Sequence, residues 1–255
     1  MFFIKTTSFL IILLFLSIFF PIHSQSVVDF NIQPIYINPD SVDDIREFNL
    51  DSIPPYIYTN IPDLSQLDVA TRKKKFIELI LPAILYEKAR VKKMYNMIDD
   101  QATSFLYDYC NCETTQDLYY CLSEQPNSII IAQAAIESGW GTSRFFLEGF
   151  NLFGIHSFYS SDIKIKAEGS DLSAPVFVKK YDGVLSSVSD YLRTLAKSNA
   201  YSEFRIYRFH NDSVKNLLVY LEKYSIRRDL YIKDLEEIIE YNNLFIYDNI
   251  EVNWK

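Results

Sequence analysis

The chain has 255 residues, of which 49% are hydrophobic and 23% are charged. This composition is typical of a globular protein and argues against a disordered one, and the length suits one domain with peripheral extensions. The net charge of −8 argues against nucleic acid as a partner, because binding to a phosphate backbone requires concentrated lysine and arginine.

The first 24 residues have the pattern of a secretory signal peptide. Lys5 precedes an apolar run over 9–20, which is followed by Pro21 and Ser24. A short positive region, an apolar core and a small residue before the cleavage point therefore occur in order. The run is shorter than the roughly 20 residues that span a bilayer, so a retained membrane anchor is the weaker alternative. We expect export to the periplasm, the cell envelope or the extracellular space, without stable membrane insertion after cleavage.

Residues 25–70 are predicted to form an extended arm. Prolines interrupt this segment, and no helical period is sustained in it. We expect the arm to lie over the surface of the domain or to be partly disordered.

Helical patterning begins near Ala70, where apolar residues start to recur at helical spacing, and continues to Met97. Pro82 is expected to kink or split this helix. A second helical stretch is predicted over 100–122.

Three cysteines, Cys110, Cys112 and Cys121, lie in the second half of that stretch. Outside the cytoplasm we expect two of them to form one local disulfide and to leave the third free; three free thiols are the alternative. A metal site would need help from a histidine or an acidic residue, and the three histidines are distant in sequence. We expect no metal and no cofactor.

The centre and the second half of the chain predict a mainly helical domain. Ser128 is predicted to cap a helix over 129–137, which is apolar on nearly every side and so belongs in the core. Alternation around a polar break over 160–181 predicts a β-hairpin. Further helices are predicted over 184–197, 213–224 and 229–241.

Glu137 stands at the end of the apolar helix, directly before the segment Gly139-Trp140-Gly141. The glycines allow the backbone to leave the helix sharply, so the carboxyl group is held against apolar groups on a rigid element. Burial raises the pKa of a carboxyl group, which suits a general acid that protonates the leaving oxygen of a glycosidic bond. The alternative is a solvated glutamate with Trp140 in the core. A negative charge at a helix C-terminus is unfavourable, however, which favours a functional role.

Two motifs, residues 133–145 (QAAIESGWGTSRF) and 151–155 (NLFGI), occur in this order and resemble the glucosaminidase family of peptidoglycan hydrolases, in particular its Bax-type members. The likeness extends over 72–248. It implies an α+β, mainly α, lysozyme-like domain over 71–250 with a small β-hairpin lobe, preceded by the arm over 25–70 and the signal peptide over 1–24. It also implies cleavage of β-1,4 bonds after N-acetylglucosamine in the glycan strands of peptidoglycan. We expect the protein to be a monomer.

The resemblance also assigns roles to single residues. Glu137 matches the catalytic acid of the family, and the positions that shape or line the substrate cleft are matched by Trp140, Asn151, Phe153 and Tyr201. Core packing is the alternative for Trp140 and Phe153, and capping of a turn is the alternative for Asn151.

A second catalytic carboxylate is expected from the β lobe, as in related enzymes. The acidic residues between Phe153 and Tyr181 are Asp162, Glu168 and Asp171. Glu168 is the only glutamate and adjoins the expected hairpin turn, so it is the predicted second carboxylate; a solvated turn residue is the alternative.

Two other functions remain open. A lytic transglycosylase can work with a single acid and also carries a Glu-Ser pair after an apolar helix, although the NLFGI motif favours the hydrolase. A catalytically silent domain that binds the cell wall is the third interpretation, and the intact surroundings of Glu137 argue against it.

Overall fold

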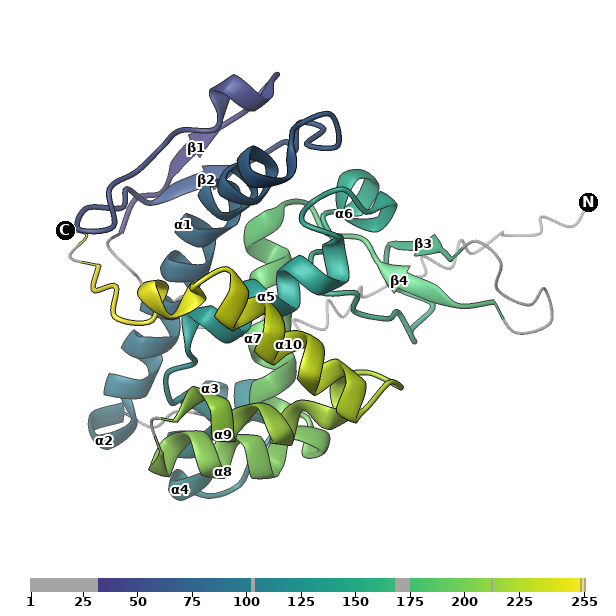
Figure 1. The fold of residues 1–255 in the computed structure, drawn as a ribbon. Helices are drawn as coiled ribbons and strands as arrows, with labels where there is room; N and C mark the ends of the chain where they lie inside the picture. Colours follow the sequence, from purple (N-terminus) through teal and green to yellow (C-terminus); the bar gives the residue numbers. More distant parts are fainter. Residues whose placement is uncertain (1–31, 102–103, 168–174, 212, 253, 255) are drawn as a thin grey trace, which may run out of the picture.

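The computed structural model describes residues 32–101, 104–167, 175–211, 213–252 and 254. The predicted signal peptide lies outside the described residues. The described residues form a largely helical body with two small two-stranded sheets, which lie on different sides of that body (Figure 1). Within these ranges, no helix combines the length and the apolar character needed to cross a membrane.

The long helix α1, Val69–Asn96, begins where the sequence predicts a helix. The carboxylate of Asp68 accepts hydrogen bonds from the backbone N–H groups of Ala70 and Thr71, so it caps donors that the helix itself leaves unpaired. The helix continues through Pro82 without being split.

Three short helices replace the single stretch predicted over 100–122. They are α2 (Ile98–Gln101), α3 (Ser104–Cys110) and α4 (Thr115–Leu122). Together with the end of α1 and with Ala196 they enclose a second, smaller apolar core.

The described part of the arm, residues 32–70, contributes side chains to the main hydrophobic core. Its strands β1 (Ile35–Ile37) and β2 (Tyr56–Tyr58) pair in parallel beside α1 (Figure 1). The buried apolar side chains of this segment that join the main core are Ile45, Ile53, Ile57, Tyr58, Ile61 and Leu64. The described part of the arm thus packs on the helical body and also contributes buried side chains to its core, which was not expected.

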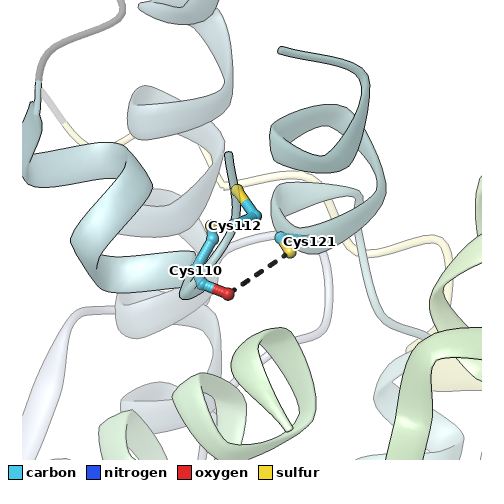
Figure 2. Close-up of side chains that lie close together, drawn as sticks. All are labelled: Cys110, Cys112 and Cys121. Atoms are coloured by element: carbon cyan, nitrogen blue, oxygen red, sulfur yellow. Dashed lines mark hydrogen bonds between the residues drawn. The ribbon is translucent and has the colours of Figure 1, made fainter. Parts of the chain in front are cut away.

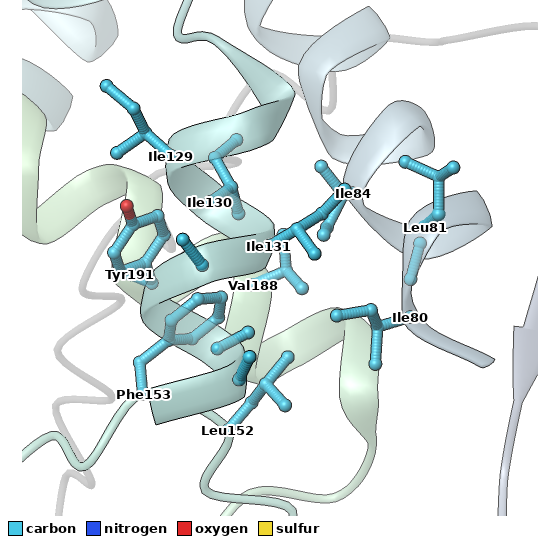
Figure 3. Close-up of a cluster of buried hydrophobic side chains, with 14 of the residues drawn as sticks. Ile80, Leu81, Ile84, Ile129, Ile130, Ile131, Leu152, Phe153, Val188 and Tyr191 are labelled. Carbon is cyan, nitrogen blue, oxygen red and sulfur yellow. The ribbon is translucent and has the colours of Figure 1, made fainter. Parts of the chain in front are cut away.

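Helix α5, Asn127–Ser138, runs through the centre of the main core. Its isoleucines pack between side chains of α1 and of α7, Val184–Lys197 (Figure 3). Each such side chain stabilises the fold by about 1.5–3 kcal/mol through burial. The helix begins after Pro126, so Ser128 lies in its first turn and is not its cap; the backbone N–H and the hydroxyl of Ser128 donate to Asp248 at 2.7 and 2.8 Å.

The remaining elements follow the predicted order. The predicted hairpin is confirmed: β3 (Lys164–Lys166) and β4 (Phe177–Lys179) pair antiparallel, while its turn lies outside the described residues. The helix bounds predicted for α7 and for α10 (Asp229–Tyr241) are confirmed, and 213–224 forms α9 (Val214–Leu218) and a 3-10 turn. Helices α6 (Arg144–Gly149) and α8 (Ser202–His210) are not predicted by the sequence pattern. The α+β, mainly α fold with a small β-hairpin lobe is confirmed.

Candidate active site

The C-terminus of α5 holds Glu137 at a sharp reversal of the chain. Gly139, Trp140 and Gly141 have φ angles of 59°, 56° and 83°, all in the left-handed region. The hydroxyl of Ser138 donates to the carbonyl of Ala134 at 2.6 Å and accepts the N–H of Gly141 at 3.0 Å, which fixes the reversal. Glu137 is thereby placed in the last turn of a helix that the core holds rigidly.

Gly154 of the NLFGI loop lies against the carboxyl group of Glu137. A Cβ atom at this position would stand 2.9 Å from Oε2 of Glu137, and the φ angle of Gly154 is +65°. Glycine is therefore required here both for its backbone conformation and for the close approach. The second motif thus supplies the wall against which the glutamate of the first motif rests.

Asn151 and Phe153 hold this loop in place. The side-chain amide of Asn151 donates to the carbonyls of Ile155 and Lys179 at 2.9 and 2.8 Å and accepts the N–H of Ile155 at 3.0 Å. The ring of Phe153 stacks on Tyr191 at 3.9 Å between centroids. Both side chains are only 1% exposed, so this geometry supports a role in shaping the site through the loop rather than by direct contact with a ligand.

Burial raises the pKa of Glu137 to about 7, and a hydrogen bond from the hydroxyl of Tyr231 works in the opposite direction. Two further tyrosines lie close to the carboxylate. Burial first and the charge of Glu137 second raise the pKa of Tyr201 to about 12, and the pKa of Tyr224 is also raised. These phenols stay protonated in the neutral range. A carboxyl group with a pKa of about 7 can donate a proton at neutral pH.

A chain of buried hydrogen bonds leads from Glu137 into the core. Tyr231 donates to Glu137 and accepts from the side-chain amide of Gln133 at 3.0 Å. The amide oxygen of Gln133 in turn accepts from the hydroxyl of Tyr191 at 2.6 Å. Each of these side chains therefore donates one hydrogen bond to the next, and every bond in the series is directed toward the carboxylate of Glu137.

This series of hydrogen bonds ends at the buried guanidinium group of Arg208. The hydroxyl of Tyr191 accepts from Gln125 at 2.9 Å, and the amide oxygen of Gln125 accepts from Arg208 at 2.7 Å. Arg208 also donates to the carbonyls of Tyr120 and Cys121. Since a guanidinium group has no acceptor, it fixes the direction of all the bonds that follow. This network orients Tyr231 and, through it, Glu137.

We expect Tyr231→Phe to shift the alkaline limb of the pH–activity profile upward. The lost hydrogen bond favours the ionised carboxylate, so its removal moves the pKa of Glu137 above about 7 and keeps the acid protonated to higher pH. The measurement is kcat between pH 5 and 9. Tyr220→Phe, which alters a phenol whose ring lies 4.9 Å from that of Tyr207 between centroids, serves as the control, and an unshifted limb in the Tyr231 variant contradicts the assignment.

The ring of Trp140 packs against side chains of α1. Its ring meets Phe76 edge-on at 5.7 Å between centroids, and Nζ of Lys73 lies 4.9 Å from the ring centroid. These contacts lock the reversal after α5 onto α1. Substrate contact by Trp140 stays a prediction, whereas Tyr201 does lie close to the acid.

The described residues do not identify the second catalytic carboxylate. Glu168 and Asp171 lie outside the described residues, so the prediction for Glu168 stays a prediction. Asp162 accepts a hydrogen bond from the hydroxyl of Ser157 at 2.9 Å near the base of the hairpin.

No role in the site was predicted from the sequence for Gly154, Gln133 or Tyr231. Gln133 precedes Glu137 by four residues on α5, so their side chains share a helix face, and this spacing was the available signal. Tyr231 lies on α10 and reaches the acid only through the tertiary fold.

Comparison with known proteins gives the same family as the motifs. A sequence model described as mannosyl-glycoprotein endo-beta-N-acetylglucosaminidase matches residues 119–244. The protein bax of Escherichia coli is 28% identical over 171 residues, which are 58% of this chain and 59% of that protein.

Among solved structures, the catalytic domain of the autolysin Auto from Listeria monocytogenes aligns with a TM-score of 0.42 at 24% identity, covering 62% of this chain and 96% of that one. A truncated glycoside hydrolase domain of Salmonella typhimurium FlgJ aligns with a TM-score of 0.36 at 22% identity, covering 54% and 97%. Residues 119–244 therefore match the glucosaminidase family, and the matched segment contains Glu137 and both motifs.

Proposed function

We propose that the protein is a peptidoglycan hydrolase that cleaves β-1,4 glycosidic bonds after N-acetylglucosamine, with Glu137 as general acid. The observation that carries this proposal is the carboxyl group of Glu137, whose pKa burial raises to about 7. It is held between Tyr231 and the backbone of Gly154. Protonation of the glycosidic oxygen avoids an alkoxide leaving group, and this step requires a carboxylic acid that keeps its proton near neutral pH.

The surroundings of Glu137 are proposed to bind the glycan strand. Tyr201 lies close to the acid, and Trp140 offers an aromatic ring at the reversal after α5. Asn151 and Phe153 contribute through the loop that carries Gly154. The enzyme is proposed to act as a monomer and without a cofactor in this reaction.

Analysis of the products tests the proposed bond. Purified peptidoglycan is digested, the fragments are reduced with borohydride, and their ends are identified by mass spectrometry. Reducing N-acetylglucosamine ends support the proposal, whereas 1,6-anhydro-muramic ends show a lytic transglycosylase.

Glu168 is proposed as the second carboxylate, which activates a water molecule or stabilises the oxocarbenium-like transition state. We expect Glu168→Gln to lose most of the lytic activity, while Asp162→Asn and Asp171→Asn retain it. The three variants are compared in one turbidity assay on purified cell walls. If the Glu168 variant is active and one aspartate variant is inactive, that aspartate is the second catalytic carboxylate. If all three variants are active, a single-acid mechanism is indicated.

Residues 1–24 are proposed to direct export and to be removed. We expect the mature protein from the native host to begin just after Ser24, as measured by mass spectrometry of its N-terminal peptide. Recovery of Met1 on a membrane-bound product contradicts cleavage and supports an anchor.

A further inference from the structure

The three cysteines converge at the turn between α3 and α4 (Figure 2). Cys110 ends α3, Cys112 follows after Asn111, whose φ angle of 50° turns the backbone sharply, and Cys121 comes from the last turn of α4. Their Sγ atoms all lie within 4.8 Å of one another, and none of the three is in a disulfide. The fold thus brings together three thiols from two helices.

The cluster is enclosed but remains accessible at one residue. Cys110 and Cys121 are 1% and 5% exposed, and the thiol of Cys121 donates to the carbonyl of Ala196 at 3.0 Å. Cys112 is only partly buried, so it forms an access route from solvent. Two thiols are therefore held in position by the core, and the third closes the site from outside.

Three mutually close thiols suit one metal ion better than one disulfide. Sulfur ligands of a zinc ion lie at about 2.3 Å from the metal, which places them about 3.8 Å apart in a tetrahedral site. Sulfur atoms that already lie within 4.8 Å of one another need only a small closing movement. A disulfide instead requires about 2.05 Å between two sulfurs and leaves the third thiol without a role.

Positive charge lies near the cluster, because the guanidinium groups of Arg205 and Arg208 both interact electrostatically with Cys121. Arg205 is fixed by hydrogen bonds to the carbonyls of Leu195 and Ser198 at 2.9 and 2.7 Å. Three thiolates with a divalent ion carry one net negative charge, which a fixed guanidinium group can balance.

We propose that Cys110, Cys112 and Cys121 bind one thiophilic d10 metal ion, Zn²⁺ or Cu⁺, through three thiolates. The site replaces the expectation of no metal and fastens α3 to α4, away from the proposed catalytic step. Among the described residues no histidine or carboxylate joins the sulfur cluster. Cu⁺ is satisfied by three thiolates, whereas Zn²⁺ would take a water molecule as its fourth ligand. Binding releases the thiol protons, and no oxidant or reductant takes part.

The test uses the full mature chain, purified anaerobically with a chelator and a reductant that are then removed. Co²⁺ is added as a spectroscopic probe, Zn²⁺ is added in competition with it, and Cu⁺ is supplied from a colorimetric chelator complex. We expect one ion per chain for Zn²⁺ or Cu⁺, thiolate charge-transfer bands with Co²⁺, and a higher Tm in the metal-bound form. The competition shows which ion binds more tightly.

Cys112→Ser is the decisive variant, because Cys112 is the least buried of the three and its replacement leaves the core intact. Since the loss of a residue that merely supports a metal ligand typically costs about 10–100-fold in affinity, loss of a ligand should weaken binding by more than about 100-fold. Glu113→Gln, which changes the neighbouring carboxylate and keeps all thiols, should bind as the wild type does.

Three results overturn the proposal. The first is a wild-type chain that has lost two hydrogens by mass and shows only one reactive thiol after denaturation, which identifies a disulfide. The second is a chain with three reactive thiols that binds no ion. The third is a Cys112→Ser variant that binds with unchanged affinity.

Discussion

Replacing Glu137 with glutamine is expected to lower the rate of glycan cleavage by at least about 100-fold, the lower end of what general acid catalysis contributes. Glutamine keeps the shape and the hydrogen bond from Tyr231, but it has no proton to donate to the leaving oxygen. The measurement is the initial rate of release of soluble fragments from purified peptidoglycan. Glu148→Gln, which changes an exposed glutamate paired with Arg144 at 3.2 Å, is the matched control and should remain active.

The same variant should be folded and at least as stable as the wild type above pH 7. The pKa of Glu137 is raised from 4.5 to about 7 in the folded protein, so the folded state holds a proton that the unfolded chain releases above pH 4.5. The free energy of unfolding therefore falls as pH rises from about 4.5 to 7, and this dependence disappears in Glu137→Gln. Thermal melts at pH 4.5 and 7.5 measure it. A folded variant with near wild-type activity would show that Glu137 is not the acid.

Gly154→Ala is expected to cause the second large loss, about 100-fold in kcat. The added Cβ would stand 2.9 Å from Oε2 of Glu137 on a backbone with φ of +65°. Either the loop or the carboxyl group must therefore move, and a displacement of about 1 Å at a reacting group can cost about 10²-fold. The measurement is kcat at a temperature well below the Tm of the variant.

Alanine substitutions at two other glycines distinguish a displacement of the Glu137 carboxyl group from a general loss of protein stability. Gly141→Ala is also strained, with φ of +83° and a Cβ 2.9 Å from the Phe76 ring, but it does not touch the carboxyl group. Gly183→Ala meets no atom within 4 Å. We expect Gly141→Ala to lower Tm with little effect on kcat at temperatures below its Tm. Gly183→Ala should change neither Tm nor kcat. Equal losses of kcat in Gly141→Ala and Gly154→Ala contradict a specific role for Gly154.

The sequence predicts best those elements whose pattern is local. The apolar run of α5 places that helix in the core, and its last turn carries the carboxyl group that the structure buries. The periodic helices α7 and α10 appear at their predicted bounds, because one apolar face of each packs against the core.

What the sequence does not predict depends on distant parts of the chain. The arm contributes to the core through side chains such as Ile45 and Tyr58. Its sequence has no regular hydrophobic periodicity from which the buried side chains could be predicted. The hydrogen bond from Tyr231 to Glu137 joins α10 to α5, and no local spacing indicates it. The burial of Asn151 and Phe153, whose side chains bond to the backbone and stack on Tyr191, also appears only in the structure.

Whether Glu137 holds its proton near neutral pH is measured most directly by NMR. The protein is labelled with ¹³C at the glutamate carboxyl carbons, and spectra of the wild type and of Glu137→Gln are compared to assign the signal. The chemical shift of that carboxyl carbon is then followed from pH 3 to 9. An apparent pKa of about 7 is the expected result. A value near the ordinary glutamate pKa of about 4.3 would contradict a protonated general acid at this site.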